Sequence, residues 1–164
     1  MQQAYCPQCG TKLRKKFLEN EGQVPYCDQC KDYRFPFFNT AISMIVVNQQ
    51  TDEILLIQQY GRKKNILVAG YLYQGENLET AVKRELAEET GLTPTVIHFN
   101  RSKFYQPSNT LMCNFTVVVD DLEDFKVNNE VDRYAWFSRS KAQEAIWPGS
   151  LAEEFLLAYL NEKN

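Results

Sequence analysis

A predicted helix over residues 77–92 constrains the fold of this chain most, because it places acidic side chains among its buried positions. A helical wheel of about 100° per residue gathers the apolar side chains of this segment into one stripe. Glu85, Glu88 and Glu89 lie within the same stripe. The helix is therefore expected to pack its first turns against a core and to line its last turns with carboxylates.

The ends of this helix follow ordinary capping rules. Asn77 is a suitable N-cap, Gly91 suits the left-handed C′ position, and Pro94 prevents the helix from continuing. The opposite, solvated face is expected to carry Thr80, Lys83, Ala87 and Thr90.

Three carboxylates on an inward helix face need nearby cations. Neighbours three or four residues apart are close enough to repel each other or to share a ligand, and the C-terminal end of a helix disfavours negative charge. A divalent metal ion would relieve both problems, which predicts chemistry on phosphates. The alternative is an ordinary solvated acidic helix end.

Composition is that of a soluble globular domain with a small appendage. The chain has 164 residues, of which 44% are hydrophobic and 24% are charged. The net charge of −3 gives no overall basic field, so a general nucleic-acid-binding role is not favoured. No apolar run is long enough to span a membrane, and the first residues do not resemble a signal peptide. The expected compartment is therefore the cytosol.

Four cysteines near the N-terminus are spaced like the ligands of a zinc ribbon. They form two Cys-x2-Cys pairs, and each pair can present two thiolates to one Zn²⁺ from a tight knuckle. The chain between the pairs predicts two short strands around Glu21-Gly22, which is too little core to fold without a metal. We therefore expect structural zinc bound by Cys6, Cys9, Cys27 and Cys30.

Two disulfides are the alternative to zinc for these four cysteines. They would need an oxidising compartment, which nothing in the sequence suggests. As a zinc ribbon, the segment would contact RNA, DNA or a partner protein, or act as plain scaffolding, and the sequence leaves these roles open. Cys113 lies in an apolar run and is expected to be a buried strand residue rather than a nucleophile.

The segment that follows the ribbon carries three phenylalanines around Pro36. We place the domain boundary there, which gives a zinc ribbon over 1–36 and a main domain over 37–164. The apolar aromatics of this linker also favour a homodimer.

The main domain alternates predicted strands and helices. β-branched and apolar runs, bounded by turn residues, predict strands at 40–48, 53–59, 65–72, 95–105, 111–119 and 130–137. Two helices are expected after them, at 138–145 and 150–161. Strands interleaved with helices predict an α/β or α+β sandwich, with the sheet in the middle and helices on both faces.

The stretch from Gly70 to Leu92 resembles the Nudix box, GX5EX7REUXEEXGU, where U is a bulky aliphatic residue. It matches the box at every defined position, and the surrounding strand order resembles the Nudix fold from about residue 38 to the C-terminus. The resemblance implies an α/β/α sandwich with a mixed sheet. It also implies hydrolysis of a nucleoside diphosphate linked to another group.

The resemblance gives each matched residue a role. Glu85, Glu88 and Glu89 would ligate Mg²⁺ or Mn²⁺. Arg84 and Glu76 would pair and hold the loop against the helix. Such ions neutralise developing charge and lower the pKa of the water that attacks phosphorus. Glu85 is one candidate for the general base, and that role stays open.

Further site residues follow from the same resemblance. Gly70 would let the backbone turn sharply and would offer its carbonyl to a metal. A zinc ribbon directly before a Nudix domain is similar to the NADH pyrophosphatase branch of the family. In that branch the position of Glu130 implies an additional metal ligand, whereas a surface acid at a strand edge is the plain alternative.

The chain departs from this branch in the segment 102–110. The branch signature SQPWPFPxS retains here only its first serine and its aromatic character. Phe104 or Tyr105 would stack on a base of the substrate, or else serve as core or loop aromatics. Asn65 and the basic run Arg62-Lys63-Lys64 precede the box strand and would either approach a substrate phosphate or form a solvated turn, and the solvated turn is the favoured interpretation.

Three functions compete at this point. The leading hypothesis is a pyrophosphohydrolase of a small nucleotide, NAD(H) or ADP-ribose. The second is removal of an NAD cap from RNA, with the ribbon aiding RNA contact. The third is a non-catalytic domain that senses a nucleotide while the ribbon binds DNA or a partner. The intact glutamates argue against a sensor, and the sequence does not rank the substrates.

Overall fold

The computed structural model describes residues 3–120 and 122–162. The chain divides into two compact units, Met1–Phe38 and Asn39–Asn164. The first unit holds the four N-terminal cysteines, and the second holds the acidic helix. Among the described residues, no helix combines the length and the apolar character that crossing a bilayer requires.

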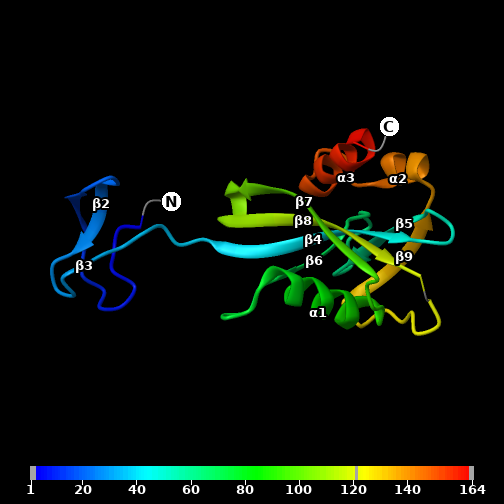
Figure 1. The fold of residues 1–164 in the computed structure, drawn as a ribbon, viewed down its shortest axis with the longest axis horizontal. Helices are drawn as coiled ribbons and strands as arrows, with labels where there is room; N and C mark the ends of the chain where they lie inside the picture. Colours follow the sequence, from blue (N-terminus) through cyan, green and yellow to red (C-terminus); the bar gives the residue numbers. More distant parts are fainter. Residues whose placement is uncertain (1–2, 121, 163–164) are drawn as a thin grey trace. The chain divides into compact units, whose positions relative to one another are not determined.

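The first unit is a small antiparallel sheet. Its strands are β1 (Arg14–Leu18), β2 (Gly22–Cys27) and β3 (Asp32–Tyr33), in that order (Figure 1). The apolar side chains buried in this unit are few, and two of them are cysteines: Cys6, Val24, Tyr26 and Cys27. A core this small gives the sheet little hydrophobic stabilisation of its own.

The second unit is built on a six-stranded mixed sheet. Its strands are β4 (Asn39–Asn48), β5 (Ile54–Gln59), β6 (Val68–Tyr71), β7 (Val96–Tyr105), β8 (Thr110–Val119) and β9 (Val131–Phe137). They lie in the order β7-β8-β4-β5-β9, and β6 pairs with β4 beside this path. The pairing of β4 with β8 is parallel over ten residue pairs, and the other pairings are antiparallel.

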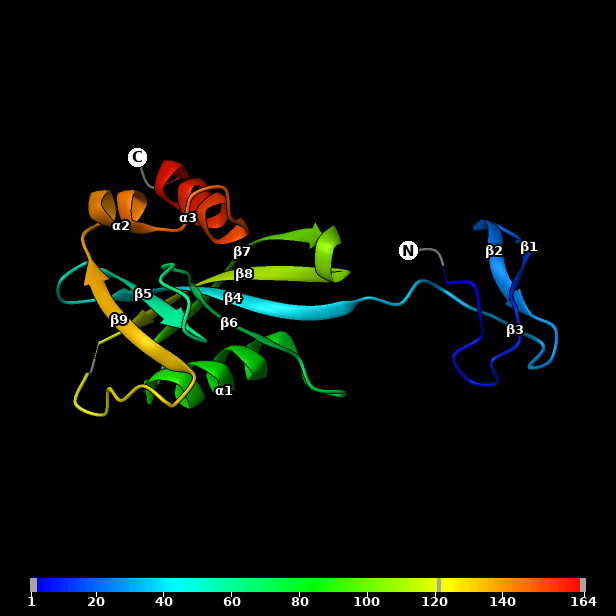
Figure 2. The same ribbon diagram turned by 180° about the vertical axis from the view of Figure 1, so that it is seen from behind.

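Helices cover both faces of this sheet. The helix α1 (Leu78–Thr90) lies on one face, and α2 (Arg139–Ala145) and α3 (Leu151–Glu162) lie on the other (Figures 1 and 2). The predicted α/β/α sandwich with a mixed sheet is therefore confirmed. Successive side chains of β4 point to opposite faces of the sheet, since Met44 belongs to the core under α1 and Ile45 to the core under α3.

The predicted helix ends are confirmed in the second unit. Asn77 Oδ1 accepts a hydrogen bond from Thr80 N at 2.9 Å. Gly91 is left-handed with φ of 71°, and its N–H donates to Ala87 O at 2.9 Å. Cys113 is buried in β8, as its apolar surroundings indicated.

Two expectations about these elements were wrong. Thr90 was placed on the solvated face, but it is fully buried, because the segment after β8 covers the end of α1 through a bond from Lys126 N to Thr90 O at 2.9 Å. The strand expected over 65–72 is regular only from Val68, because Asn65 and Ile66 make isolated bridges instead.

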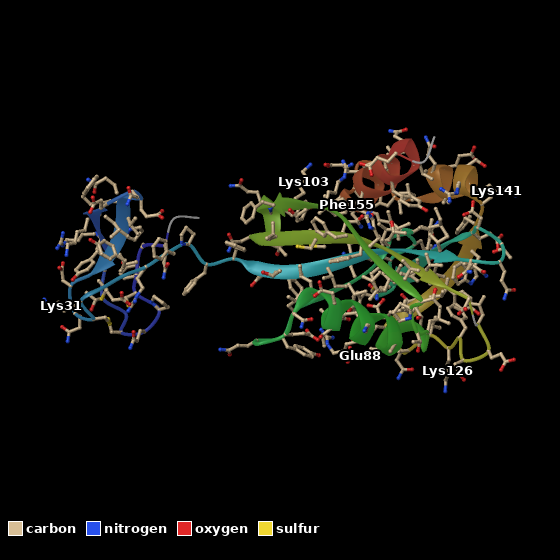
Figure 3. The ribbon with its side chains drawn as sticks, in the orientation of Figure 1. Lys31, Glu88, Lys103, Lys126, Lys141 and Phe155 are labelled. Carbon is tan, nitrogen blue, oxygen red and sulfur yellow. The ribbon has the colours of Figure 1, made fainter. Side chains whose placement is uncertain are left out.

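The core under α3 offers a direct test of this packing. Phe155 is 1% exposed and projects from α3 toward the sheet (Figure 3). We expect Phe155→Ala to lower the free energy of unfolding by about 3–5 kcal/mol, since it removes buried contacts and leaves a cavity. Urea denaturation measures this change. The matched control is Lys141→Ala on the exposed side of α2, with an effect of about 0.5 kcal/mol or less. Equal midpoints for the two variants would contradict the assignment.

Candidate active site

The side chain of Arg84, in the middle of α1, organises the acidic residues around it. Its guanidinium donates to both carboxylate oxygens of Glu76, each at 2.8 Å. It also donates to Glu85 Oε1 at 2.7 Å and to Glu88 Oε2 at 3.0 Å. A further bond to Tyr71 O at 3.0 Å ties the helix to the end of β6. One cation thereby holds three carboxylates and one carbonyl in fixed positions.

The pairing of Arg84 with Glu76 closes the loop between β6 and α1. Glu76 Oε2 also accepts a hydrogen bond from Tyr73 N at 3.0 Å, and the Tyr73 ring lies 4.0 Å from the Arg84 guanidinium carbon. These hydrogen bonds, led by those from Arg84, lower the pKa of Glu76 to about 2. The carboxylate therefore stays ionised throughout the physiological range.

Gly70 lies beside the carboxylate of Glu85. A Cβ at position 70 would come within 1.9 Å of Glu85 Cδ, so only glycine leaves room for this side chain. Gly70 pairs with Ile42 inside β6 and is absent from the glycines with positive φ. The expected sharp backbone turn at Gly70 is therefore not present, and the reason for glycine here is the close approach of a side chain.

Glu89 is the buried member of the acidic set, with an exposed fraction of 3%. Gln59 Nε2, at the end of β5, donates to Glu89 Oε1 at 3.0 Å, whereas Glu89 Oε2 has no hydrogen-bond partner among the described residues. Burial raises the pKa of Glu89 to about 7, and the nearby carboxylates act in the same direction. A buried carboxylate oxygen without a partner is suited to ligating a cation.

Glu89 and Gln59 line a cleft of about 500 Å³ between the end of β5, the end of β6 and α1. Glu130, just before β9, joins Glu85, Glu88 and Glu89 in the lining. Its Oε2 accepts a hydrogen bond from Tyr60 Oη at 3.0 Å, and this bond raises the pKa of Tyr60. All four predicted carboxylates therefore face one cleft, and Gly70 contributes to its wall.

The donor set of this cleft fits a hard divalent cation. Carboxylate oxygens are the ligands that Mg²⁺ and Mn²⁺ prefer, together with waters and phosphate oxygens. Among the described residues, only the cysteines bring three or more ligand atoms within 4.8 Å of one another. The carboxylates are less closely grouped, because Glu85 and Glu88 bond to Arg84 instead of converging.

The aromatic residues expected to contact substrate lie elsewhere on the same unit. Phe104 and Tyr105 end β7, with exposed fractions of 46% and 41%. Tyr105 lines a second cavity of about 400 Å³ beside the start of α3. Met112 and Ala69 line both this cavity and the acidic cleft, so the two are neighbours. Phe104 lines neither of them.

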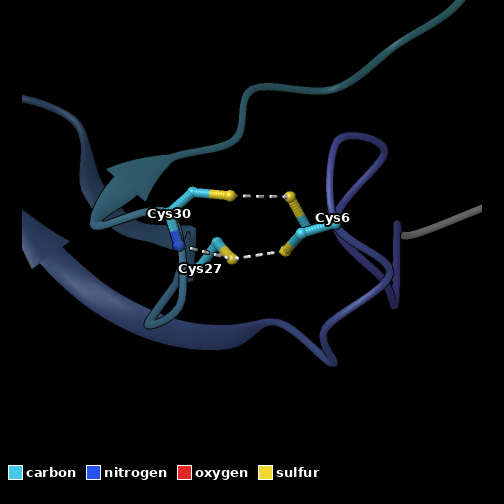
Figure 4. A group of neighbouring side chains, drawn as sticks. Cys6, Cys27 and Cys30 are labelled. Carbon is cyan, nitrogen blue, oxygen red and sulfur yellow. Dashed lines mark hydrogen bonds between the residues drawn. The ribbon is translucent and has the colours of Figure 1, made fainter.

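The four N-terminal cysteines form a cluster within the first unit (Figure 4). The Sγ atoms of Cys6 and Cys30 are 3.9 Å apart, and those of Cys9 and Cys27 are 3.4 Å apart. Tetrahedral zinc with Zn–S bonds of about 2.3 Å places its sulfurs about 3.8 Å apart, whereas a disulfide bond is about 2.05 Å long. The cysteines are all free, so the geometry is compatible with a zinc ribbon and differs from that of disulfides.

The electrostatics of the cluster also favour a bound cation. Arg34 Nε donates to Cys6 Sγ at 3.3 Å and lowers the pKa of Cys6 to about 6. The pKa of Cys30 is raised to about 12, chiefly by its contact with Cys9. The opposite shifts of Cys6 and Cys30 show that neighbouring thiolates disfavour one another, which a bound cation would relieve.

Gln59 and Tyr60 are cleft residues that sequence reasoning did not single out. Both follow the apolar run of β5, where a buried strand ends in polar residues. A polar residue that ends a fully buried strand is the signal that would have identified Gln59. Tyr60 carries no such signal, because its role depends on a contact with Glu130, 70 residues away.

Comparison with known proteins agrees with this geometry. The model of the NUDIX domain matches residues 38–156. The NAD-capped RNA hydrolase NudC of Vibrio parahaemolyticus is 27% identical over 155 residues, and that of Photobacterium profundum is 31% identical over 156. A NUDIX hydrolase from Nitrosomonas europaea superimposes with a TM-score of 0.65 at 18% identity, covering 98% of this chain and 92% of that one, which shows the fold.

The chain spans about half the length of the curated relatives it matches. The alignment covers 93% of this chain but 57% of the Vibrio protein, and 92% of this chain but 55% of the Photobacterium protein. The substrates in the names of those longer proteins therefore describe those proteins and not this chain.

The raised pKa of Glu89 predicts a pH-dependent stability in the absence of metal. A carboxyl with an ordinary value of 4.5 and a folded value of about 7 favours the folded state when protonated. We expect the free energy of unfolding of the metal-free protein to fall between these two pH values, by on the order of 2 kcal/mol. Urea denaturation in chelator across this window measures the fall.

Glu89→Gln should remove most of this pH dependence, because glutamine does not titrate. Glu79→Gln, an exposed acid in the first turn of the same helix, is the matched control and should retain it. An unchanged pH profile in Glu89→Gln would show that another group carries the effect.

Proposed function

The chain belongs to the Nudix family, and from that premise we propose that it is a divalent-metal-dependent pyrophosphohydrolase of a dinucleotide of the NAD(H) or ADP-ribose type. The observation that carries this proposal is the cleft that Glu85, Glu88, Glu89 and Glu130 line together, in which one buried oxygen of Glu89 has no hydrogen-bond partner among the described residues. Nudix enzymes generally use divalent metals, and the donor set here suits Mg²⁺ or Mn²⁺.

The residues in and around the cleft would have different roles in the proposed reaction. Glu85, Glu88, Glu89 and Glu130 would hold the metal, and Gly70, which lines the same cleft, would offer its carbonyl to it. When bound there, the metal supplies charge neutralisation at the diphosphate and a water of lowered pKa. Arg84 and Glu76 keep the helix and the loop in register, so the backbone that carries the carboxylates stays in place when substrate enters. Attack of water on one phosphorus breaks the P–O–P bond and releases two monophosphates.

NAD-capped RNA is the second candidate substrate, and the comparisons favour it. The curated relatives from Vibrio and Photobacterium carry the name NAD-capped RNA hydrolase. The bond cleaved would be the same diphosphate, so the cleft serves either substrate. Phe104 and Tyr105 are the proposed stacking residues for a base, supported by the position of Tyr105 in the neighbouring cavity.

We propose structural zinc for the cysteine cluster, and contact with RNA or DNA for the ribbon that the zinc would hold. The sulfur separations and the shifted pKa values of Cys6 and Cys30 support zinc. A cytosolic protein would also keep its cysteines reduced.

A homodimer is proposed from the exposed phenylalanines at 35, 37 and 38, since exposed aromatic side chains mark association sites.

The test of the proposed reaction is hydrolysis of a dinucleotide panel with Mg²⁺ or Mn²⁺. We expect wild type to release two monophosphates from NAD(H) or ADP-ribose, as chromatography would show. Glu88→Gln and Glu89→Gln should lower kcat/KM by about 100-fold or more, because each removes a ligand charge. Glu79→Gln should stay near wild type.

Two results would overturn this proposal. If wild type hydrolyses neither the dinucleotides of the panel nor NAD-capped RNA with either metal, the hypothesis that the protein is an enzyme is wrong. If it binds ADP-ribose tightly without turnover, the protein is a nucleotide sensor instead.

The zinc proposal has its own test in metal analysis of the full chain. We expect about one zinc per chain, with loss of zinc and greater protease sensitivity of the ribbon in Cys9→Ser. Cys113→Ser, which alters a buried thiol in β8, is the control and should retain zinc. Equal zinc content in Cys9→Ser and wild type would exclude a four-cysteine site.

A further inference from the structure

The loop between β5 and β6 begins at the rim of the acidic cleft. Tyr60 lines the cleft and donates to Glu130, while Gly61 N donates to Asp132 Oδ2 at 2.6 Å. Tyr60 and Gly61 both have left-handed φ values, 55° and 69°. A non-glycine residue in this region is retained only where its surroundings fix it, so the loop leaves the cleft along a defined path.

The far end of the loop is also fixed. Asn65 Oδ1 accepts a hydrogen bond from Gln58 Nε2 at 2.9 Å, and Asn65 Nδ2 donates to Ala145 O at 2.9 Å. Trp147 N donates to Asn65 O at 2.9 Å. The three residues between these anchors, Arg62, Lys63 and Lys64, are called the basic loop below. They are presented to solvent from a backbone held at both ends, which lowers the entropy lost when they bind a ligand.

The cations of the basic loop are exposed and have no carboxylate partner among the described residues. Elsewhere among the described residues of this unit, some cations pair with an acid (Arg84, Arg101, Lys103 and Arg139) and others do not (Lys83, Lys126, Arg133 and Lys141). Lys64 instead lies over the Trp147 ring, 3.6 Å from its centroid. Three adjacent cations without a carboxylate partner repel one another, so the loop that follows the cleft residue Tyr60 favours an anionic partner.

More positive charge lies at the same edge of the sheet. Arg133 on β9 is exposed and is the register partner of Gln58, which holds Asn65. Cross-strand partners lie on the same face of a sheet, so Arg133 lies with Gln58 on the face that α2 and α3 cover, where Asn65 is also held. The partly exposed ring of Trp147 adds an aromatic surface next to the basic loop.

A free dinucleotide does not account for these cations. Its diphosphate is the group that is cleaved, and so it belongs at the carboxylates of the cleft. The basic loop continues the chain from the cleft residue Tyr60 but is not part of the cleft lining, so a substrate needs further phosphates to contact it. Resting on the proposed function, we propose that the basic loop binds the backbone phosphates of an RNA strand whose 5′ dinucleotide occupies the cleft. Cations on one side and an aromatic ring beside them are what single-stranded RNA binds.

The test compares one reaction on two substrates. Wild type and the Arg62→Ala/Lys63→Ala variant are assayed on free NAD and on an RNA of about ten nucleotides with NAD at its 5′ end. We expect the variant to lose about tenfold in kcat/KM on the RNA and less than about twofold on free NAD. The slope of log kcat/KM against log salt should fall by about 1.4 on the RNA, since each lost contact contributes about 0.7.

A matched control separates local contacts from overall charge. Lys83→Ala/Lys141→Ala removes the same charge from the exposed sides of α1 and α2, and it should leave both substrates unaffected. Equal loss in the two double variants on RNA would overturn the proposal, because net charge would then explain the effect. If Arg62→Ala/Lys63→Ala loses no kcat/KM on the RNA, the proposal is also overturned, and the basic loop is then an ordinary solvated turn.

A third arm distinguishes a polynucleotide from a single extra phosphate. If Arg62→Ala/Lys63→Ala impairs NADP as strongly as the RNA, the basic loop binds one phosphate of a small substrate and the RNA proposal fails. Failure of the proposed function would look different, since wild type would then cleave neither substrate. Fluorescence anisotropy of the same RNA on Glu89→Gln, with and without the Arg62→Ala/Lys63→Ala change, still tests the basic loop. Equal RNA affinity in those two proteins would overturn it.

Discussion

The guanidinium of Arg84 is the interaction on which the second unit's chemistry depends. Without it, α1 would bring several carboxylates together around one cleft with no positive charge between them. Its bidentate bond to Glu76 fixes the loop, and its bonds to Glu85 and Glu88 fix the helix face. The same side chain therefore joins loop, helix and strand end into one rigid frame. A lysine could not serve here, because it lacks the planar fork of donors that reaches these partners together.

The frame also explains how an acidic helix can pack on a hydrophobic sheet. The first turns of α1 bury Ala81, Val82 and Leu86, which supply the contacts that hold the helix in place. The acidic residues then lie where the helix leaves the core and borders the cleft. Only Glu89 is fully buried, and its cost is visible in its raised pKa. The protein thus tolerates one poorly solvated carboxylate, and the proposed metal would compensate for it.

Much of this arrangement could be predicted from the sequence, because helical periodicity and capping residues are local signals. The helix ends at Asn77 and Gly91 and the three-layer architecture are examples. Features that depend on distant segments could not be predicted in the same way. Thr90 was misplaced because the segment that buries it lies beyond the next two strands. The bond from Gln59 to Glu89 and the anchors of the loop after Tyr60 likewise join residues far apart in the chain.

The contact between Gly70 and Glu85 has a consequence for how such sequences are compared. A side chain at position 70 and a carboxylate at position 85 would occupy the same space. The place of the carboxylate therefore favours glycine at position 70, whereas the acid at position 85 is set by its own proposed role in the cleft. A pattern that scores the two positions as unrelated misses this one-way dependence.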